Sequence, residues 1–298
     1  MKKKKGTQTL VTRKYAKRSQ IGEIFYRLRK NKGALAGMLI FAVILLLFLG
    51  SLLFISYDMA TEGNVYNRLQ SPSAEFPFGT DHMGRSLFLR VLYGSRYSLT
   101  IGFAGSFVAA TIGISLGCFA GFYGGIVENL IMRAAEVLTS IPGILFGMVI
   151  MTTFGSNMQN LIITVSVNSI PMYVRMTRAS ILSVRGQEFV EAARAIGLPN
   201  LRIIFKQILP NGLSPIIITF TMNLGMMVMA ASALSFLGFG ITAPRPEWGT
   251  LVAGGREFAR NAPHLLYFPG IFIMALVLAF NMIGDGLRDA LDPKLKTR

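Results

Sequence analysis

Five long stretches without Asp, Glu, Lys or Arg limit what this chain can fold into. They are residues 33–57, 97–127, 137–174, 207–244 and 261–284. About 20 apolar residues in a helix cross the roughly 30 Å hydrocarbon core of a bilayer, so each stretch can hold at least one spanning helix. The stretch 137–174 is long enough for two, and the polar segment 155–160 divides it. The sequence therefore predicts an all-α, polytopic membrane protein with six transmembrane helices.

The composition agrees with this fold class. Charged residues make up 15% of the chain, against about 25% in soluble domains. The first uncharged stretch is much longer than the 7–15 apolar residues of a secretion signal, so we predict that it is retained as a helix. The single cysteine, Cys118, lies inside the second predicted span. We expect it to pack there as a small apolar side chain.

The positive charge is unevenly distributed. Most of the 30 lysines and arginines fall in residues 1–33, near Arg133, in residues 175–206 and in residues 288–298. Six spans place all of these segments on one side of the membrane, and the basic side of a membrane protein faces the cytoplasm. We therefore expect both termini in the cytoplasm. The basic N-terminal tail is expected to contact anionic membrane lipid, and no nucleic-acid partner is predicted.

Two parts are expected along the chain: a basic leader with one span, and a core with five. Ile21, Ile24, Phe25 and Leu28 recur at helical spacing among basic residues, which favours a helix lying along the cytoplasmic interface; an ordinary solvated helix start is the alternative. The first segment, residues 1–33, combines a basic tail with the interfacial helix, and its residues 1–18 are expected to be disordered. The following segments are the first transmembrane helix (34–57), an external segment (58–96), the five-helix core (97–287) and a cytoplasmic tail (288–298).

The second predicted span is rich in glycine. Gly113, Gly117 and Gly121 are four residues apart and lie on one helical face. Small residues at this spacing let two helix backbones approach closely in lipid. We interpret them as packing residues without a chemical role.

The cytoplasmic loop 179–212 is the most informative polar segment. Phe189, Ala192, Ala193 and Ile196 share one helical face, and Gly197 stands where a helix ends in a left-handed turn. A second apolar stripe follows, made of Leu201, Ile204, Phe205 and Ile208, and Pro210 ends it. The pattern predicts two short helices around a tight turn outside the membrane, with Glu191 and Arg194 at the edge. Such a hairpin either docks another subunit or packs on its own helix ends.

Several motifs together resemble a known family, the permease subunits of binding-protein-dependent ABC importers. The hairpin motif is Glu191-Ala192-Ala193, Gly197 and Ile208-Leu209-Pro210. Four further segments, Phe78–Arg85, Tyr93–Leu99, Leu234–Gly238 and Pro246–Gly249, and the C-terminal segment Asn281–Pro293 narrow the resemblance to the dipeptide/oligopeptide/nickel type, on the DppC/OppC side. Family members often carry an acidic residue where Ser86 stands, and a Glu where Ala231 stands.

The resemblance implies a type I ABC importer permease (MetI-like) fold and a set of partners. These are a homologous second permease forming a heterodimer, two ABC ATPase subunits that bind ATP and Mg, and an external solute-binding protein. It further implies that Glu191, Ala192, Ala193, Arg194 and Gly197 couple the chain to an ATPase. The expected location is the cytoplasmic (inner) membrane of a bacterium or archaeon, and the expected cargo is a peptide, a nickel or metal chelate, or a similar small solute.

Two further sets of residues are candidates for function. Gly79, Thr80, Asp81, Gly84 and Arg85 form a compact external motif. It is predicted to shape an outer gate or contact the binding protein, or else to cap the helix ends; Asp81 and Arg85 are spaced to pair across one helical turn. The candidates for lining the translocation path share polar or adaptable side chains within spans four and five, although bundle packing explains each equally well. They are Asn168, Asn223, Met229, Ser232 and Ser235.

At the cytoplasmic end of the last span, Asp285 and Arg288, or Arg288 and Asp292, are predicted to form a structural clasp. Contact of this segment with an ATPase is the alternative.

Other classes of protein lack support in the sequence. There is no phosphate-binding loop motif, and His82, His264 and Cys118 give no ordinary zinc arrangement. We therefore predict no catalytic residue, no metal site and no cofactor on this chain. An ion-coupled secondary transporter is the alternative, but the centres of the predicted spans lack the ionisable groups that proton coupling requires. An integral membrane enzyme is a third class, and no nucleophile and base are paired for it.

Overall fold

The computed structural model describes residues 20–291, without the side chains of Gln20, Ile21, Glu23 and Ile24. The predicted disordered segment 1–18 and the last residues, 292–298, lie outside this range, as does the pair proposed for Asp292. Every regular element in the described range is a helix, apart from one isolated bridge between Thr80 and Ser86. The predicted all-α class is confirmed for this range.

The helices follow one another along the chain with only short connections, apart from the longer external segment before α4. The regular helices are α1 (Gln20–Lys30), α2 (Lys32–Phe54), α3 (Tyr57–Thr61), α4 (Leu87–Tyr123), α5 (Gly125–Ser140), α6 (Gly143–Phe154), α7 (Met158–Val184), α8 (Glu188–Ala195), α9 (Asn200–Arg202), α10 (Leu209–Asn211), α11 (Leu213–Leu234), α12 (Trp248–Gly255) and α13 (His264–Leu291). Tighter or wider helical turns are η1 (Val65–Asn67), η2 (Ile203–Ile208), η3 (Ser235–Phe239) and η4 (Arg256–Phe258).

The number of spans differs from the prediction. Four helical segments in the described range are long and apolar enough to cross a membrane: Lys32–Phe54, Leu87–Tyr123, Leu213–Phe239 and His264–Leu291. The pair α5 and α6 makes a fifth if it counts as one span. Helix α7 is long enough, but polar residues such as Asn168 and Arg175 lower its hydropathy. The predicted count of six is therefore not confirmed.

The region between α4 and α7 departs most from the expected straight spans. Helix α4 ends at Tyr123, and Gly124 follows with a φ of +69°, so the chain turns there. The position of Arg133 was expected to be the cytoplasmic turn between the second and third spans, and this expectation is wrong. Arg133 lies inside α5 and pairs with Glu136 at 2.8 Å. The chain then bends by 82° before α6. The bend has a local cause, because a residue before proline avoids helical angles, and Ile141, before Pro142, is extended.

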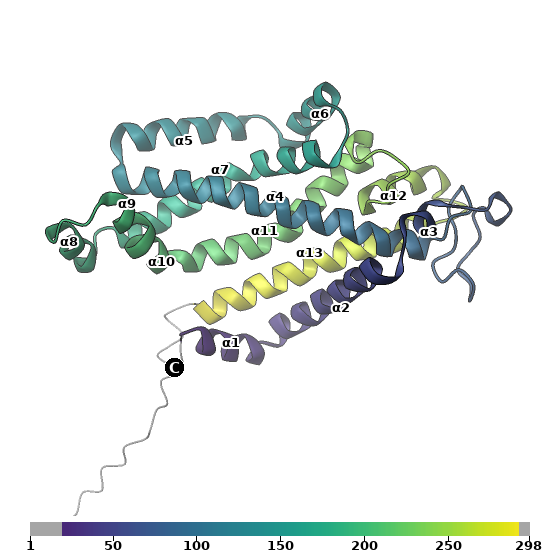
Figure 1. Cartoon of the computed structure of the whole chain (residues 1–298), viewed down its shortest axis with the longest axis horizontal. Helices are drawn as coiled ribbons and strands as arrows, with labels where there is room; N and C mark the ends of the chain where they lie inside the picture. Colours follow the sequence, from purple (N-terminus) through teal and green to yellow (C-terminus); the bar gives the residue numbers. More distant parts are fainter. Residues whose placement is uncertain (1–19, 292–298) are drawn as a thin grey trace, which may run out of the picture.

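The long helices form one bundle (Figure 1). Helix α2 packs on α13, α13 on α11, and α11 on both α4 and α7. The helices α8 to α10 lie at one end of this bundle, together with α1 and the C-terminal end of α13, whereas α3 and α12 lie at the opposite end (Figure 1). Both ends of the described range therefore lie on the same side of the bundle as the predicted coupling hairpin.

The predicted close approach along the glycine face of α4 is confirmed. Added Cβ atoms would lie 2.4 Å from Tyr173 Cβ at Gly113, 2.6 Å from Thr177 Cβ at Gly117 and 2.8 Å from Ile181 Cβ at Gly121. Each glycine thus receives one residue of α7, and the three α7 residues are also four apart. The two helices pack at backbone distance along one face, as small residues permit in lipid.

Replacing Gly117 with alanine is expected to destabilise the bundle by about 1–3 kcal/mol, because the new methyl group overpacks the contact with α7. The measurement is thermal loss of the helical circular-dichroism signal in detergent. The matched control is Gly50→Ala in α2, where an added Cβ meets nothing within 4 Å. Equal melting temperatures for the two variants would contradict the close packing of α4 on α7.

Candidate functional site

The predicted hairpin outside the bundle consists of α8, a glycine turn and the segment α9–η2–α10. Gly197 has a φ of +76°, and its N–H donates to the carbonyl of Arg194 at 2.9 Å. The N–H of Leu198 donates to the carbonyl of Ala193 at 3.1 Å. These two bonds close α8 in the manner of a helix that ends at a left-handed glycine. Pro199 then precedes α9, so the chain reverses within a few residues.

One side of the hairpin is anchored in the bundle. Val190 is fully buried and Ala193 is 6% exposed. They pack in one apolar cluster with residues of α4, α7 and η2, namely Cys118, Phe122, Ile181, Val184, Ile203, Ile204 and Ile208. Arg194 lies with its guanidinium carbon 5.3 Å from the centre of the Phe122 ring. The hairpin is therefore attached to the ends of α4 and α7.

The opposite side of the hairpin is exposed in the part of the chain that the structure describes. Ile196 is 76% exposed and Leu201 is 56% exposed, and Glu191 and Ala192 are exposed as well. The prediction of one common apolar face on α8 is wrong, because Ala193 points into the bundle while Ala192 and Ile196 point away from it. The second predicted stripe is also divided: Ile204 and Ile208 are buried, whereas Leu201 and Phe205 are exposed.

Two arginines that the sequence analysis did not single out hold the base of the hairpin. Arg178 Nε donates to Glu128 Oε1 at 2.6 Å, which joins α7 to α5. Arg185 Nη1 donates to the carbonyls of Gly121 and Phe122 at 2.9 and 3.2 Å. A cation at the C-terminus of α4 satisfies carbonyls that have no partner within the helix. The helix ends that carry the hairpin are thus tied to one another.

The external motif forms a tight, buried turn. Gly79 and Gly84 have φ angles of +74° and +73°, and a Cβ at these positions would lie 2.4 Å from the Gln70 carbonyl oxygen and 1.8 Å from that of Asn64. Thr80 is fully buried. Its hydroxyl accepts the N–H of Gln70 at 2.9 Å and donates to the carbonyl of Asn67.

Asp81 is the centre of this turn. Its Oδ1 accepts the backbone N–H groups of Met83 and Arg85 at 2.8 and 3.0 Å, and its Oδ2 accepts Arg85 Nε at 2.7 Å. Arg90 Nε lies 3.5 Å from Oδ2, and Arg90 Nη1 donates to the carbonyl of Ala60. The predicted pair of Asp81 and Arg85 is confirmed, but it closes a non-helical turn. Asp81 and Arg85 are 5% and 6% exposed, so this arrangement fixes the loop over the helix ends.

The candidate path residues divide between two hollows on either side of α11. Asn168 and Asn223 line a hollow of about 310 Å³ beside α6 and α7. Met229 and Ser232 line a larger one of about 560 Å³ between α11, α12 and α13. Asn223 donates to the Tyr173 hydroxyl at 3.1 Å. Ser235 is 3% exposed and is not among the residues that line either hollow.

Glu247 is a buried carboxylate that the sequence analysis quoted only within a motif. It is fully buried at the N-terminus of α12, where it accepts the N–H groups of Gly249 and Thr250, each at 2.9 Å. The hydroxyls of Ser98 on α4 and Ser232 on α11 donate to its Oε1 at 3.3 and 3.5 Å. An acidic residue immediately before a predicted helix is the signal for such a cap. Glu247 thus joins three helices beside the larger hollow.

The C-terminal end of α13 carries weaker contacts. Arg288 Nη1 lies 3.8 Å from Asp285 Oδ1, with both side chains more than half exposed. The predicted clasp between them is present, but such an exposed pair stabilises a protein by at most about 1 kcal/mol.

A bundle of long apolar helices with one anchored hairpin at its end defines a multi-pass membrane protein. Residues 113–297 match the family of binding-protein-dependent transport system inner membrane components, and residues 19–72 match the N-terminal TM domain of oligopeptide transport permease C. The chain belongs to the first of these families and is a permease subunit of an ABC importer. The resemblance found in the sequence is confirmed.

Similar proteins agree with this assignment. A dipeptide transport system permease protein DppC from Alkalihalophilus pseudofirmus is 45% identical over 92% of this chain and 90% of its own length. A glutathione transport system permease protein GsiD from Pectobacterium atrosepticum is 40% identical over 91% of this chain and 89% of its own length. A chain of the MetNI methionine ABC transporter has a TM-score of 0.57 at 20% identity, covering 68% of this chain and 97% of that one. This structural likeness supports the MetI-like fold.

Proposed function

We propose that the chain forms half of the translocation pathway of an importer for short peptides, paired with a homologous second permease. The DppC and GsiD relatives are permeases for dipeptides and for glutathione, which is itself a tripeptide. An external solute-binding protein would deliver the peptide. The two hollows beside α11 are the proposed surfaces along the path, and the external turn around Asp81 would keep the outer gate in shape.

Two ATPase subunits would supply the energy, and the hairpin is the proposed site where one of them docks. The supporting observation is that Ile196 and Glu191 are exposed while Val190 and Ala193 are buried against α4 and α7. Force on the exposed side would therefore pass directly into two long helices. ATP and Mg would be bound by the ATPases, and this chain would hold no cofactor and catalyse no reaction.

The proposed orientation places the hairpin and both termini in the cytoplasm of a bacterium or archaeon. The hairpin end of the bundle carries α1, with the basic residues Arg27, Arg29 and Lys30 in its last turn. It also carries the C-terminal end of α13 (Figure 1). Basic segments remain on the cytoplasmic side during insertion, so both observations support this orientation.

Replacing Ile196 with cysteine gives the test of docking. Cys118 is fully buried, so the new thiol would be the accessible one on this chain, and it is expected to cross-link to an ATPase subunit in the assembled transporter. Peptide uptake into proteoliposomes is expected to require ATP and to stop when the ATPase is inactivated. Uptake that ionophores abolish but ATPase inactivation does not would instead identify an ion-coupled transporter.

A further inference from the structure

The corner between α1 and α2 is held in a fixed shape. Asn31 caps α2 by accepting the N–H of Ala34 at 3.1 Å, and its amide nitrogen donates to Asp289 Oδ2 at 2.9 Å. Leu28, 8% exposed, packs with Ala34 and Ala290. One side of α1 is thus attached to the end of α13, and this attachment directs the opposite side away from the bundle.

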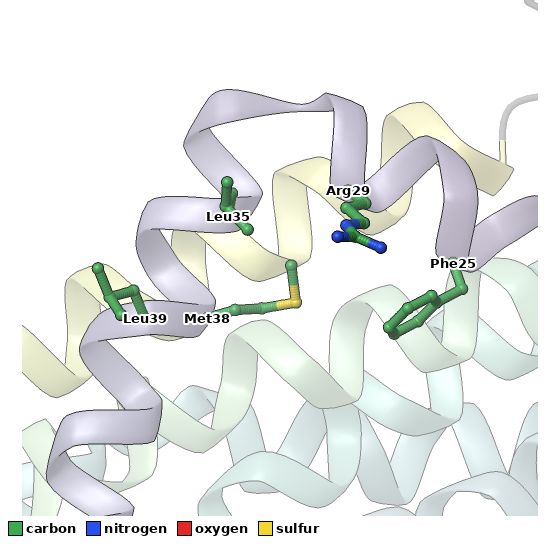
Figure 2. A pocket seen from close by; sticks show the side chains of 5 residues that line it. All are labelled: Phe25, Arg29, Leu35, Met38 and Leu39. Atoms are coloured by element: carbon green, nitrogen blue, oxygen red, sulfur yellow. The ribbon is translucent and has the colours of Figure 1, made fainter.

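A groove opens on that opposite side. Phe25 and Arg29, four residues apart on α1, face Leu35, Met38 and Leu39 at the beginning of α2 (Figure 2). The hollow has a volume of about 330 Å³ and is lined by these five side chains. Four of them are apolar and one carries a positive charge. In the described part of the chain, Arg29 has no ion-pair or hydrogen-bond partner.

The apolar side of the groove continues along α2. Leu35, Leu39, Val43 and Leu46 are between 49% and 67% exposed, and they follow one another at intervals of three or four residues. The opposite side of α2, which includes Gly37, packs against α13. The stripe from Leu35 to Leu46 extends for about 16 Å at 1.5 Å per residue, which is about half of the roughly 30 Å hydrocarbon core.

We propose that this groove binds an anionic phospholipid, with the phosphate at Arg29 and one acyl chain along the α2 stripe. The charge of the groove favours this occupant, because a zwitterionic lipid carries a cation that Arg29 repels. Lys32 lies outside the groove lining, and Lys30 lies over the Tyr26 ring at 4.5 Å, so Arg29 is the cation of the groove. The stripe length matches one leaflet. The assignment to the cytoplasmic leaflet rests on the proposed orientation of the chain, with the hairpin and both termini in the cytoplasm.

A tryptophan placed in the groove tests the proposal. The chain has one natural tryptophan, Trp248, which is fully buried. The variant Leu39→Trp, purified with its partner subunits, is reconstituted in nanodiscs that contain either brominated phosphatidylglycerol or brominated phosphatidylcholine. Bromine quenches tryptophan on contact. The reporter is expected to prefer phosphatidylglycerol about fivefold, because one basic residue near an anionic lipid surface contributes about 1 kcal/mol.

Three controls decide the origin of the preference. Adding Arg29→Gln is expected to remove it, whereas adding Lys32→Gln, which deletes an equal charge outside the groove lining, is expected to leave it. A reporter at Leu53, 78% exposed at the far end of α2, is expected to show no preference. If Lys32→Gln removed the preference for phosphatidylglycerol as fully as Arg29→Gln does, the preference would be a diffuse charge effect. If neither lipid quenched the reporter, a protein would cover the groove. Both results would overturn the proposal.

The result of the lipid experiment can be distinguished from the result that tests the proposed transport function. Both leaflets of these nanodiscs have the same composition, so the preference does not depend on the orientation of the chain. ATP-dependent peptide uptake by the same reporter variant in proteoliposomes is measured independently. A failed lipid preference with intact uptake would reject the lipid site and leave the transport proposal in place.

Discussion

Replacing Gly197 with valine is expected to lower ATP-driven uptake more than tenfold while leaving membrane insertion unchanged. The φ of +76° at this residue lies in the left-handed region, which costs an L-residue roughly 1–2 kcal/mol and a branched residue more. An added Cβ would meet nothing within 4 Å. Overlap of the added Cβ with neighbouring residues is therefore not the cause, and the expected effect acts through the backbone conformation of the turn after α8. Uptake of labelled peptide into proteoliposomes is the measurement.

Asparagine at the same position provides the matched control. It accepts left-handed angles more readily than other non-glycine residues, so Gly197→Asn is expected to retain most of the uptake. Cross-linking from Ile196→Cys to the ATPase should be lost with valine and kept with asparagine. Normal uptake by the valine variant, or equal loss with both, would contradict coupling through a rigid hairpin.

Replacing Asp81 with alanine is expected to destabilise the protein by about 3–5 kcal/mol. The substitution leaves the guanidinium groups of Arg85 and Arg90 buried without their common carboxylate, and breaking a buried pair in this way is strongly unfavourable. It also removes the acceptor for two backbone N–H groups of the turn. Because Cys118 is the single cysteine and is fully buried, its reaction with a thiol-reactive dye on heating measures unfolding.

The matched control breaks an exposed pair in the same chain. Glu136 pairs with Arg133 at 2.8 Å, but the side chains are 52% and 80% exposed. Exposed pairs contribute about 0–1 kcal/mol, so Glu136→Ala is expected to melt close to the wild type. If Asp81→Ala also melted close to the wild-type temperature, the stability of the external turn would not depend on its buried charges.

Much of the fold was predictable because it follows from local patterns. Charge-free stretches indicated most of the membrane helices, and the spacing of Gly113, Gly117 and Gly121 indicated a close helix contact. The glycine after α8 indicated the turn at Gly197. The bend between α5 and α6 was not predicted, although Pro142 was visible, because a proline within an apolar stretch is compatible with both a straight and a bent span.

The candidate sites were less predictable from the sequence. Periodicity placed Ala192 and Ala193 on one face, yet the structure separates them, since only the position of α4 and α7 decides which side of so short a helix is buried. The pairing of Asp81 with Arg85 was predicted from spacing. The contribution of Arg90 was not, because it comes from the next element of the chain.

The sequence by itself determined that this chain is a helical membrane protein, because hydrophobicity and tight-turn residues act locally and are visible in order along the chain. Its motifs also carry the resemblance to ABC importer permeases. The tertiary structure alone decided which side chains of separate elements meet: Glu247 with Ser98 and Ser232, Arg178 with Glu128, and Arg29 with apolar residues at the beginning of α2. These groups are distant in sequence or lie on separate helices. Their proximity depends on how the helices pack, which no local pattern specifies.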